Sequence, residues 1–178
     1  FLDVTGSTRW SGSATMIARE IKTRIHLRTG LTASAGVSYN KFLAKIASGI
    51  NKPDGLFVIT PEQGESFIAL LPVGKFFGVG KATEARMHQL GIFTGEDLKR
   101  RSEDELVRHF GKTGHFFYNI ARGIDERPVI AERLRKSVSK ETTFDEDLRD
   151  PDLMLQQLLQ LSAQVASVLR KEQLKART

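Results

Sequence analysis

The sequence predicts an α/β layer, then an all-helical region, then the start of a second α/β unit. Three observations lead to this fold class. Apolar residues recur at helical spacing between positions 14 and 25. Short β-branched runs lie on both sides of a second helical stretch, and alternating strands and helices are typical of an α/β layer. After position 60, short helical patterns are separated by glycines.

Residues 1–59 are expected to form the α/β layer. Residues 1–5 alternate enough to be a strand. The first helix has one apolar face, formed by Ala14, Ile17, Ala18, Ile21 and Ile25, and Gly30 ends it. The remaining predicted elements are a buried strand at 31–37, a helix at 41–50, a turn at 51–55 and a strand at 56–59.

Residues 60–124 are expected to be helical, with recognisable helix ends. In residues 60–63, threonine is the N-cap, proline takes the first helical position and glutamine closes a capping box. Ser102 and Glu105 predict another capping box, and Gly111 is placed to end that helix.

The third region has a β-like piece at 136–144 and then a long amphipathic helix. Asp150 is the predicted N-cap and Pro151 the first helical residue. The apolar side of this helix consists of Leu158, Leu161, Val165, Val168 and Leu169.

The charge distribution favours a polyanionic partner. Lys and Arg number 27 against 21 Asp and Glu, which leaves +6. Residues 1–59 hold eight basic residues against three acids, so they carry +5 of that charge. Lys and Arg bind phosphates by displacing counterions. The alternative is a basic soluble protein with no such partner.

Composition also excludes some classes of protein. The sequence has no cysteine, which rules out disulfides and thiolate metal sites. The four histidines are scattered, so we expect no metal site. No apolar run is long enough to span a membrane, and we expect a cytoplasmic protein without a membrane partner. The chain begins inside an apolar run and not at methionine, so we expect both ends to be truncations.

The sharpest local signal is the glycine turn at residues 77–81, which runs into a helix. Gly78, Val79, Gly80 and Lys81 are therefore candidate DNA-binding residues. Glycines let a phosphate approach the backbone, and the helix N-terminus adds partial positive charge. The alternative is a turn that only connects two helices. Nucleotide-binding glycine fingerprints fit poorly.

Four further lysines are candidates for phosphate contact. Lys41 and Lys45 lie one helical turn apart, and Lys52 precedes a proline–glycine turn. A lysine ammonium held in this way suits a triphosphate or a DNA phosphate, although a solvated basic face explains the same residues. Lys112 lies in a fainter glycine turn, where a helix C-cap with a solvated lysine is the alternative.

Clustered carboxylates, which phosphoryl transfer through two metal ions usually requires, are not apparent. Residues 1–59 offer only Asp3, Glu20 and Asp54, on a strand, a helix and a turn. We therefore expect neither catalytic residues nor metal ligands in this chain.

Several motifs, in order, resemble the Y-family DNA polymerases. The matching strings are FLDVT at 1–5, TASAGVS at 32–38, NKFLAKIAS at 40–48, NKPDG at 51–55, GVGK at 78–81, GID at 123–125 and LRKSV at 134–138. The resemblance covers nearly the whole chain, and the combination is highly specific.

The resemblance implies a domain organisation. Residues 1–59 match the later part of a ferredoxin-like palm, and 60–124 match a helical thumb whose helix-hairpin-helix holds the DNA backbone. Residues 125–131 are then a linker, and 132–178 begin an α+β little-finger domain. Lys52 matches the family lysine that contacts the phosphates of the incoming nucleotide.

The resemblance also implies what lies outside the chain. The family's Mg²⁺-binding acids and its steric gate fall before Phe1, and the tail that binds the sliding clamp falls after the end. Asp3 matches a non-catalytic acid. Within the chain, Phe77 stands where relatives commonly have proline.

We thus expect part of an error-prone translesion DNA polymerase that uses primer–template DNA and deoxynucleoside triphosphates. The chain itself would bind DNA but be inactive. A non-catalytic, structure-specific DNA-binding scaffold related to the polymerases is the alternative. A protein-interaction module explains neither the glycine turn nor the charge.

Overall fold

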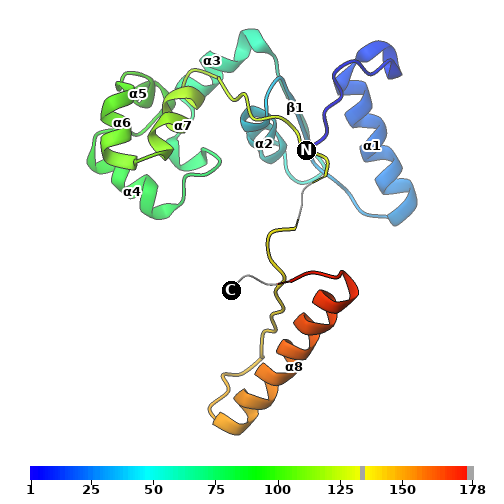
Figure 1. Cartoon of the computed structure of the whole chain (residues 1–178). Coiled ribbons are helices and arrows are strands. Elements are labelled where there is room, and N and C mark those ends of the chain that lie inside the picture. The colour runs from blue at the N-terminus through cyan, green and yellow to red at the C-terminus, as the bar shows by residue number, and fades with distance from the viewer. Residues whose placement is uncertain (133–134, 176–178) are drawn as a thin grey trace. The chain divides into compact units, whose positions relative to one another are not determined.

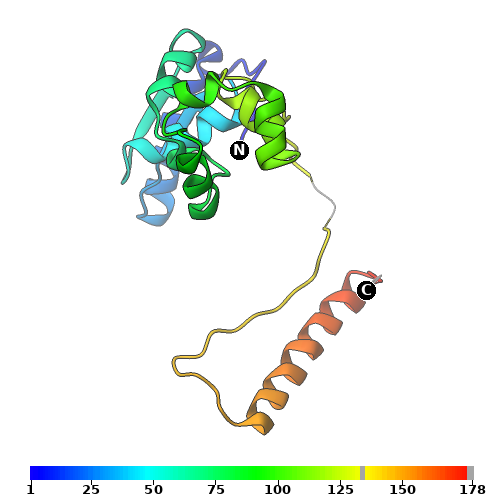
Figure 2. The ribbon, with the colours of Figure 1, turned by 90° about the vertical axis from the view of Figure 1, so that its left-hand side faces the viewer.

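The computed structural model describes residues 1–132 and 135–175. The chain consists of two compact units, Phe1–Val129 and Ile130–Thr178. Figure 1 shows the α/β layer and the short helices of the first unit, and Figure 2 shows the second unit's helix α8 preceded by an extended segment. The elements in chain order are η1 (Arg9–Gly12), α1 (Ala14–Thr29), β1 (Ala35–Ser38), α2 (Lys41–Ile50), β2 (Leu56–Ile59), α3 (Pro61–Leu70), η2 (Val73–Lys75), α4 (Lys81–Gln89), α5 (Gly95–Lys99), α6 (Glu103–Phe110), α7 (Thr113–Ile120) and α8 (Pro151–Lys171).

The α/β layer is a parallel pair of strands connected by α2. β1 and β2 pair with Ala35 opposite Leu56, and α2 packs on both strands. A β-carbon on Gly36 of β1 would lie 2.2 Å from the carbonyl oxygen of Ala44 in α2. Only glycine therefore lets the strand approach the helix this closely. The predicted bounds of α2 and β2 are confirmed.

The helices of this layer begin and end where the sequence predicts. The Ser13 hydroxyl accepts the Met16 N–H at 3.3 Å at the start of α1. Gly30 ends α1 with a φ of 70°, in the left-handed region that favours glycine. The Asn40 side chain accepts the Leu43 N–H at 2.9 Å and caps α2.

Residues 1–5 do not form the predicted strand, so that prediction was wrong. The Thr5 N–H donates to Asp3 Oδ1 at 2.9 Å, and the Ser7 N–H donates to the Val4 carbonyl oxygen at 3.0 Å. The segment therefore closes local turns. A strand needs a neighbour that supplies N–H and C=O groups, and in the described residues the sheet consists of β1 and β2.

Two other strand predictions need correction. The strand predicted at 31–37 is right in type but begins late, because β1 starts at Ala35. Residues 136–144 form no strand in the described part of the chain. No partner strand pairs with these residues there, and unpaired extended backbone is not a sheet. Leu134, at the start of the last matching string, lies outside the described residues.

One apolar core supports both the α/β layer and the helices that follow it. Phe42 of α2 is fully buried, and its ring meets the rings of Phe76 and Phe116 at 5.3 and 6.5 Å in edge-to-face geometry. Phe76 directly precedes the glycine turn, and Phe116 belongs to α7. The core therefore holds the glycine turn against α2 and α7. Other buried members of this core are Leu43, Ile68, Met87, Leu106 and Phe117.

Of the two capping boxes that the sequence predicts, the first forms both of its hydrogen bonds and the second forms one. At the start of α3, Thr60 and Gln63 form the predicted box, and the Thr60 N–H donates to Gln63 Oε1 at 3.2 Å. At the start of α6, the Ser102 hydroxyl accepts the Glu105 N–H at 3.2 Å. The Glu105 carboxylate instead accepts the Arg101 guanidinium at 2.9 Å, because charge-assisted hydrogen bonds are the stronger choice.

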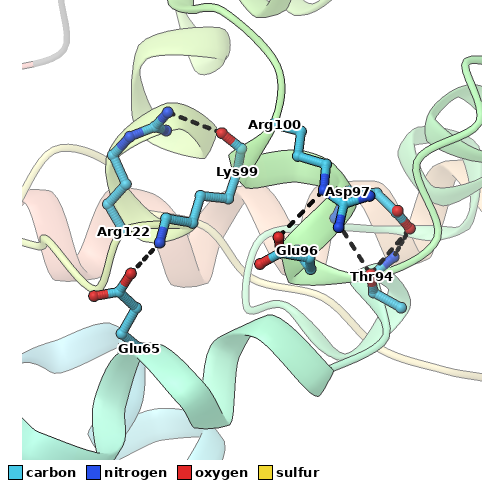
Figure 3. A network of polar contacts seen from close by, with 7 residues as sticks. All are labelled: Glu65, Thr94, Glu96, Asp97, Lys99, Arg100 and Arg122. Atoms are coloured by element: carbon cyan, nitrogen blue, oxygen red, sulfur yellow. Dashed lines mark hydrogen bonds and ion pairs between the residues drawn. The ribbon is translucent and has the colours of Figure 1, made fainter.

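Polar contacts join α3, α5 and α7, as Figure 3 shows. The Arg122 guanidinium, just after α7, donates to the carbonyl oxygens of Lys99 and Tyr118, each at 2.9 Å. The Lys99 ammonium forms an ion pair with Glu65 of α3. Arg122 thereby bonds the C-terminal ends of two helices, where carbonyl oxygens lack partners within the helix.

The second unit is dominated by α8. Its start at Asp150 is confirmed, because the Asp150 side chain accepts the Asp152 N–H at 2.9 Å. Arg135 and Glu172 form an ion pair at 3.1 Å within this unit. The predicted apolar side is partly covered in the described residues: Leu161, Val165, Val168 and Leu169 are half-buried, whereas Leu158 is 60% exposed. No helix in residues 1–132 and 135–175 combines the length and apolar character needed to cross a membrane.

Candidate nucleic-acid interface

The glycine turn between η2 and α4 is an exposed hairpin that directly follows the buried Phe76. We call residues 77–81 the first hairpin. The Phe76 carbonyl oxygen accepts the Val79 N–H at 3.0 Å, which closes the turn. Gly78 has a φ of 96°, a conformation that glycine adopts without steric strain. Val79 packs against the core, whereas Phe77 and Gly78 are exposed.

The N-terminus of α4 opens to solvent at this hairpin. Gly80 is the N-cap, and a β-carbon on Gly80 would meet nothing within 4 Å. Gly80 and Lys81 are both exposed. The first N–H groups of a helix have no partners within the helix and carry partial positive charge. Glu84, the acid in this first turn, has its carboxylate against Gly74. An anion can therefore reach the backbone at Gly80.

Lys45 of α2 lies beside the first hairpin. Its Nζ atom is 6.0 Å from the centroid of the Phe77 ring, within the range of a cation–π contact. Both side chains are exposed. A lysine 32 residues earlier in the sequence thus adds its charge to the hairpin. Phe77 provides the ring for this contact.

Lys41 has a different environment from Lys45, although the two lie one turn apart. The Lys41 ammonium donates to the Pro128 carbonyl oxygen at 3.2 Å and lies 5.3 Å from the centroid of the Phe1 ring. The structure therefore does not bring Lys41 and Lys45 to one common partner.

The second glycine turn, between α6 and α7, also leads into a helix N-terminus. Gly111 ends α6 with a φ of 59°, as predicted, and Lys112 is exposed. A β-carbon on Gly114 would lie 2.4 Å from the backbone of Leu106, so α6 and α7 pack very closely. The ring of Phe116 in α7 is 3.7 Å from the position of a β-carbon on Gly78. The first hairpin thus lies against the helix that Lys112 precedes.

Lys52 lies on the turn between α2 and β2, and its side chain is exposed. The turn is held by Lys22 of α1, whose ammonium contacts Asp54 and Gly55. We did not single out Lys22 from the sequence, because a lysine on a helix of mixed polarity has the pattern of a solvated residue.

Asp125 connects the end of the helical region to the start of α2. Its side chain is 1% exposed, accepts the Phe42 N–H at 2.9 Å and pairs with Arg127 at 2.6 Å. The Asn40 amide also donates to the Gly123 carbonyl oxygen at 2.8 Å. Burial acts to raise the pKa of Asp125, but the Arg127 contacts and the Phe42 N–H outweigh it and hold that pKa below its ordinary value. In Figure 1 this segment returns from α7 to α2.

The three acids of residues 1–59 do not gather. Hydrogen bonds from Thr5 lower the pKa of Asp3. A hydrogen bond from the Trp10 indole lowers the pKa of Glu20, which also pairs with Arg24. Asp54 pairs with Lys22. Within residues 1–132 and 135–175, no three His, Asp or Glu side chains are placed to hold one metal ion.

Three family models match successive parts of the chain. The impB/mucB/samB family matches residues 1–49. A model described as the thumb domain of DNA polymerase iota matches residues 75–125, which include the first hairpin. The C-terminal domain of the impB/mucB/samB family matches residues 135–178.

Individual relatives match along the whole chain. DNA polymerase IV of Alkalilimnicola ehrlichii is 58% identical over 100% of this chain and 50% of its own length. DNA polymerase IV of Gluconobacter oxydans is 51% identical over the same shares of the two chains. The chain spans about half the length of the curated relatives it matches.

Solved structures show the same likeness. A Y-family DNA polymerase chimera has a TM-score of 0.75 and 29% identity, covering 86% of this chain and 44% of its own. DinB from Sulfolobus solfataricus has a TM-score of 0.60 and 32% identity, covering 65% of this chain and 34% of its own.

Proposed function

Because this chain belongs to the Y family of DNA polymerases, we propose that it is the DNA-binding part of a template-directed polymerase that copies damaged DNA with low fidelity. The observation that carries the proposal is the first hairpin. The α4 N-terminus is open at Gly80, and the Lys45 ammonium lies over the adjacent Phe77 ring. These groups recognise a phosphate of primer–template DNA, which every sequence presents equally.

The hairpin contact is made by backbone N–H groups and lysine charge. Gly80 leaves room for a phosphate oxygen, and Lys81 and Lys45 supply positive charge beside it. Lys112, at the N-terminus of α7, extends the same mode of binding to the second glycine turn. Lys41 contributes charge from α2. Because these contacts are to the phosphate backbone, binding is independent of sequence.

Lys52 is assigned to the triphosphate of the incoming deoxynucleoside triphosphate. Its ammonium is exposed on a turn whose backbone is closed by Gly55. A compact ammonium on a fixed turn is a suitable point charge for a phosphate. The resemblance of residues 51–55 to the family supports the same role.

The catalytic step requires groups that the described residues do not provide. Asp3, Glu20 and Asp54 are each engaged by a local partner and do not fit a Mg²⁺ site. The proposal assigns Mg²⁺ binding to acids outside this chain in the complete polymerase, so that the 178-residue chain binds DNA without extending a primer.

Two further parts of the proposal concern the complete protein. A sliding clamp is its expected protein partner, bound through a segment outside this chain. Its compartment is the cytoplasm, in keeping with a cysteine-free sequence. Both follow from the family and not from a contact in the described residues.

The proposed DNA contact is tested by fluorescence anisotropy with labelled primer–template DNA of two unrelated sequences. Gly80→Glu places a carboxylate where the phosphate binds, and Gln89→Glu makes the same charge change at the other end of α4. We expect Gly80→Glu to weaken binding to both sequences by about tenfold or more, the effect of losing a charged hydrogen bond. Equal losses in the two variants would contradict the hairpin contact.

Polymerase activity is tested by extension of a primer on damaged and undamaged templates. We expect the complete protein to extend the primer in the presence of Mg²⁺ and the 178-residue chain not to do so. Extension by the chain alone would contradict the assignment of the acids. If the complete protein binds DNA but does not extend, the DNA-binding scaffold replaces the polymerase.

A further inference from the structure

The ammonium group of Lys22 is bound by the turn that carries Lys52. Lys22 Nζ donates to the carbonyl oxygen and to Oδ1 of Asp54, both at 2.6 Å. It also contacts the carbonyl oxygens of Ala33 at 2.7 Å and Gly55 at 3.3 Å. The Lys22 side chain is 15% exposed. A lysine has three N–H donors, and these four acceptors engage all of them.

This arrangement differs from an ordinary surface ion pair. The Asp54 side chain is 57% exposed, and a pair of that kind contributes little by itself. Three of the four acceptors, however, are backbone carbonyl oxygens of Ala33, Asp54 and Gly55. The position of a carbonyl oxygen depends on the path of the chain, so the Lys22 ammonium favours one backbone conformation of the turn.

The turn needs such support because its backbone is tightly constrained. Asp54 has a φ of 53°, a conformation that residues with a β-carbon rarely adopt. A β-carbon on Gly55 would lie 1.9 Å from the Asn51 carbonyl oxygen, so the turn closes tightly on itself. Lys52 lies in this turn between Asn51 and Asp54 and is exposed. The direction of its side chain therefore depends on how the turn is held.

We propose that Lys22 is a positioning residue for nucleotide binding: it fixes the 51–55 turn in the conformation in which Lys52 meets the triphosphate. The inference rests on the proposed function of Lys52. Lys22 acts through the backbone of the turn and has no direct contact with the nucleotide. Lys22 therefore affects the binding of the triphosphate and not the binding of primer–template DNA, because the first hairpin lies on other elements.

The test measures steady-state incorporation of dTTP opposite a template adenine by the complete polymerase that contains this chain. Lys22→Met keeps the length of the side chain and removes its donors, and Lys52→Ala removes the proposed phosphate ligand. Loss of a charged hydrogen bond to phosphate raises KM for dTTP by about tenfold or more in Lys52→Ala. We expect Lys22→Met to raise KM in the same direction by about three- to tenfold, with a smaller effect on kcat.

Matched variants separate positioning from general damage. Lys22→Arg retains charge and donors and is expected to recover most of the KM change. Arg19→Met removes the same charge from the exposed side of α1 and should leave KM unchanged. Asp54→Asn keeps a side-chain acceptor but removes the negative charge of one of the four acceptors. It should raise KM slightly, which keeps the test informative if Lys22→Met does not fold. Primer–template affinity should be unchanged in all of these variants.

The double variant Lys22→Met/Lys52→Ala tests whether Lys22 changes KM by acting through Lys52. If Lys22 acts through Lys52, the double variant has the KM of Lys52→Ala alone, because the second change has nothing left to disturb. Additive effects on KM overturn the positioning role. A normal KM in Lys22→Met together with a raised KM in Lys52→Ala overturns the inference and leaves the proposed function intact. A normal KM in Lys52→Ala overturns both.

Discussion

The Asp125 carboxylate accepts the backbone N–H of Phe42 at 2.9 Å and so joins positions 83 residues apart. Phe42 lies in the first turn of α2, the helix that carries Lys45. Asp125 follows the helices that carry the first hairpin. The contact therefore helps set where Lys45 stands relative to the hairpin, which makes the proposed DNA contact dependent on a buried carboxylate.

Asp125→Asn should destabilise the chain. The amide can still accept the Phe42 N–H, but the contact with the Arg127 guanidinium loses its charge. Since the Asp125 side chain is 1% exposed, we expect the free energy of unfolding to fall by about 1–3 kcal/mol. Urea unfolding measures this. Asp147→Asn, at an exposed position in the second unit, is the control, and equal stability of the two variants would contradict the buried contact.

Because the Asp125 carboxylate has a lowered pKa, we also expect the free energy of unfolding to depend on pH. The pKa of Asp125 in the folded chain lies below its ordinary value. A depressed pKa means that Asp125 stabilises the fold above the unfolded pKa of about 4, and that this contribution is lost as the pH falls through the folded pKa. We expect urea unfolding of Asp125→Asn to depend less on pH in this window than unfolding of the original chain. Identical pH profiles would exclude this role for Asp125.

Phe77→Ala should weaken DNA binding without unfolding the chain. The ring is 45% exposed, and its interaction with the Lys45 ammonium is worth about 0.5–1 kcal/mol at an exposed site. We expect a two- to fivefold loss of affinity, roughly the factor that this energy represents, measured by anisotropy. Phe93→Ala removes a ring that is 54% exposed and stacks on His88 instead. Affinity should be unchanged in that control, and a loss in both variants would argue against a specific role for Phe77.

Arg122→Ala should loosen the junction of α3, α5 and α7. Its guanidinium makes two hydrogen bonds to carbonyl oxygens and stacks on the Tyr118 ring at 3.5 Å. We expect a loss of about 2–3 kcal/mol of unfolding free energy, from two charged hydrogen bonds and the stacking. Arg122→Lys should recover little, since a single ammonium cannot replace the planar fork. Full recovery by lysine would mean that only the charge matters.

The sequence predicts the local structure of this chain better than its pairing. α2 and β2 were located because helical spacing and β-branched residues act over a few positions. The strand at residues 1–5 was wrong because a strand depends on a neighbour that the pattern does not reveal. For the same reason, the β-like piece predicted at 136–144 forms no strand in the described residues.

In the candidate site too, features set by local sequence can be predicted, and features set by contacts between distant segments cannot. The first hairpin is recognisable from the sequence, since Gly78 adopts a positive φ that favours glycine and Gly80 leaves the N-terminus of α4 open. The approach of Lys45 to Phe77 depends on the packing of Phe42 against Phe76, which no local pattern contains. The roles of Lys22 and Asp125 likewise come from contacts between distant segments.

The salt dependence of primer–template binding tests the central claim most directly, because it counts the phosphates that the chain contacts. The logarithm of the binding constant should fall linearly with the logarithm of salt concentration, by about 0.9 per phosphate neutralised. We expect Gly80→Glu to make this slope less steep by about one phosphate contact or more, with the slope of Gln89→Glu unchanged. A slope that is the same in Gly80→Glu and the original chain would contradict a phosphate contact at the first hairpin.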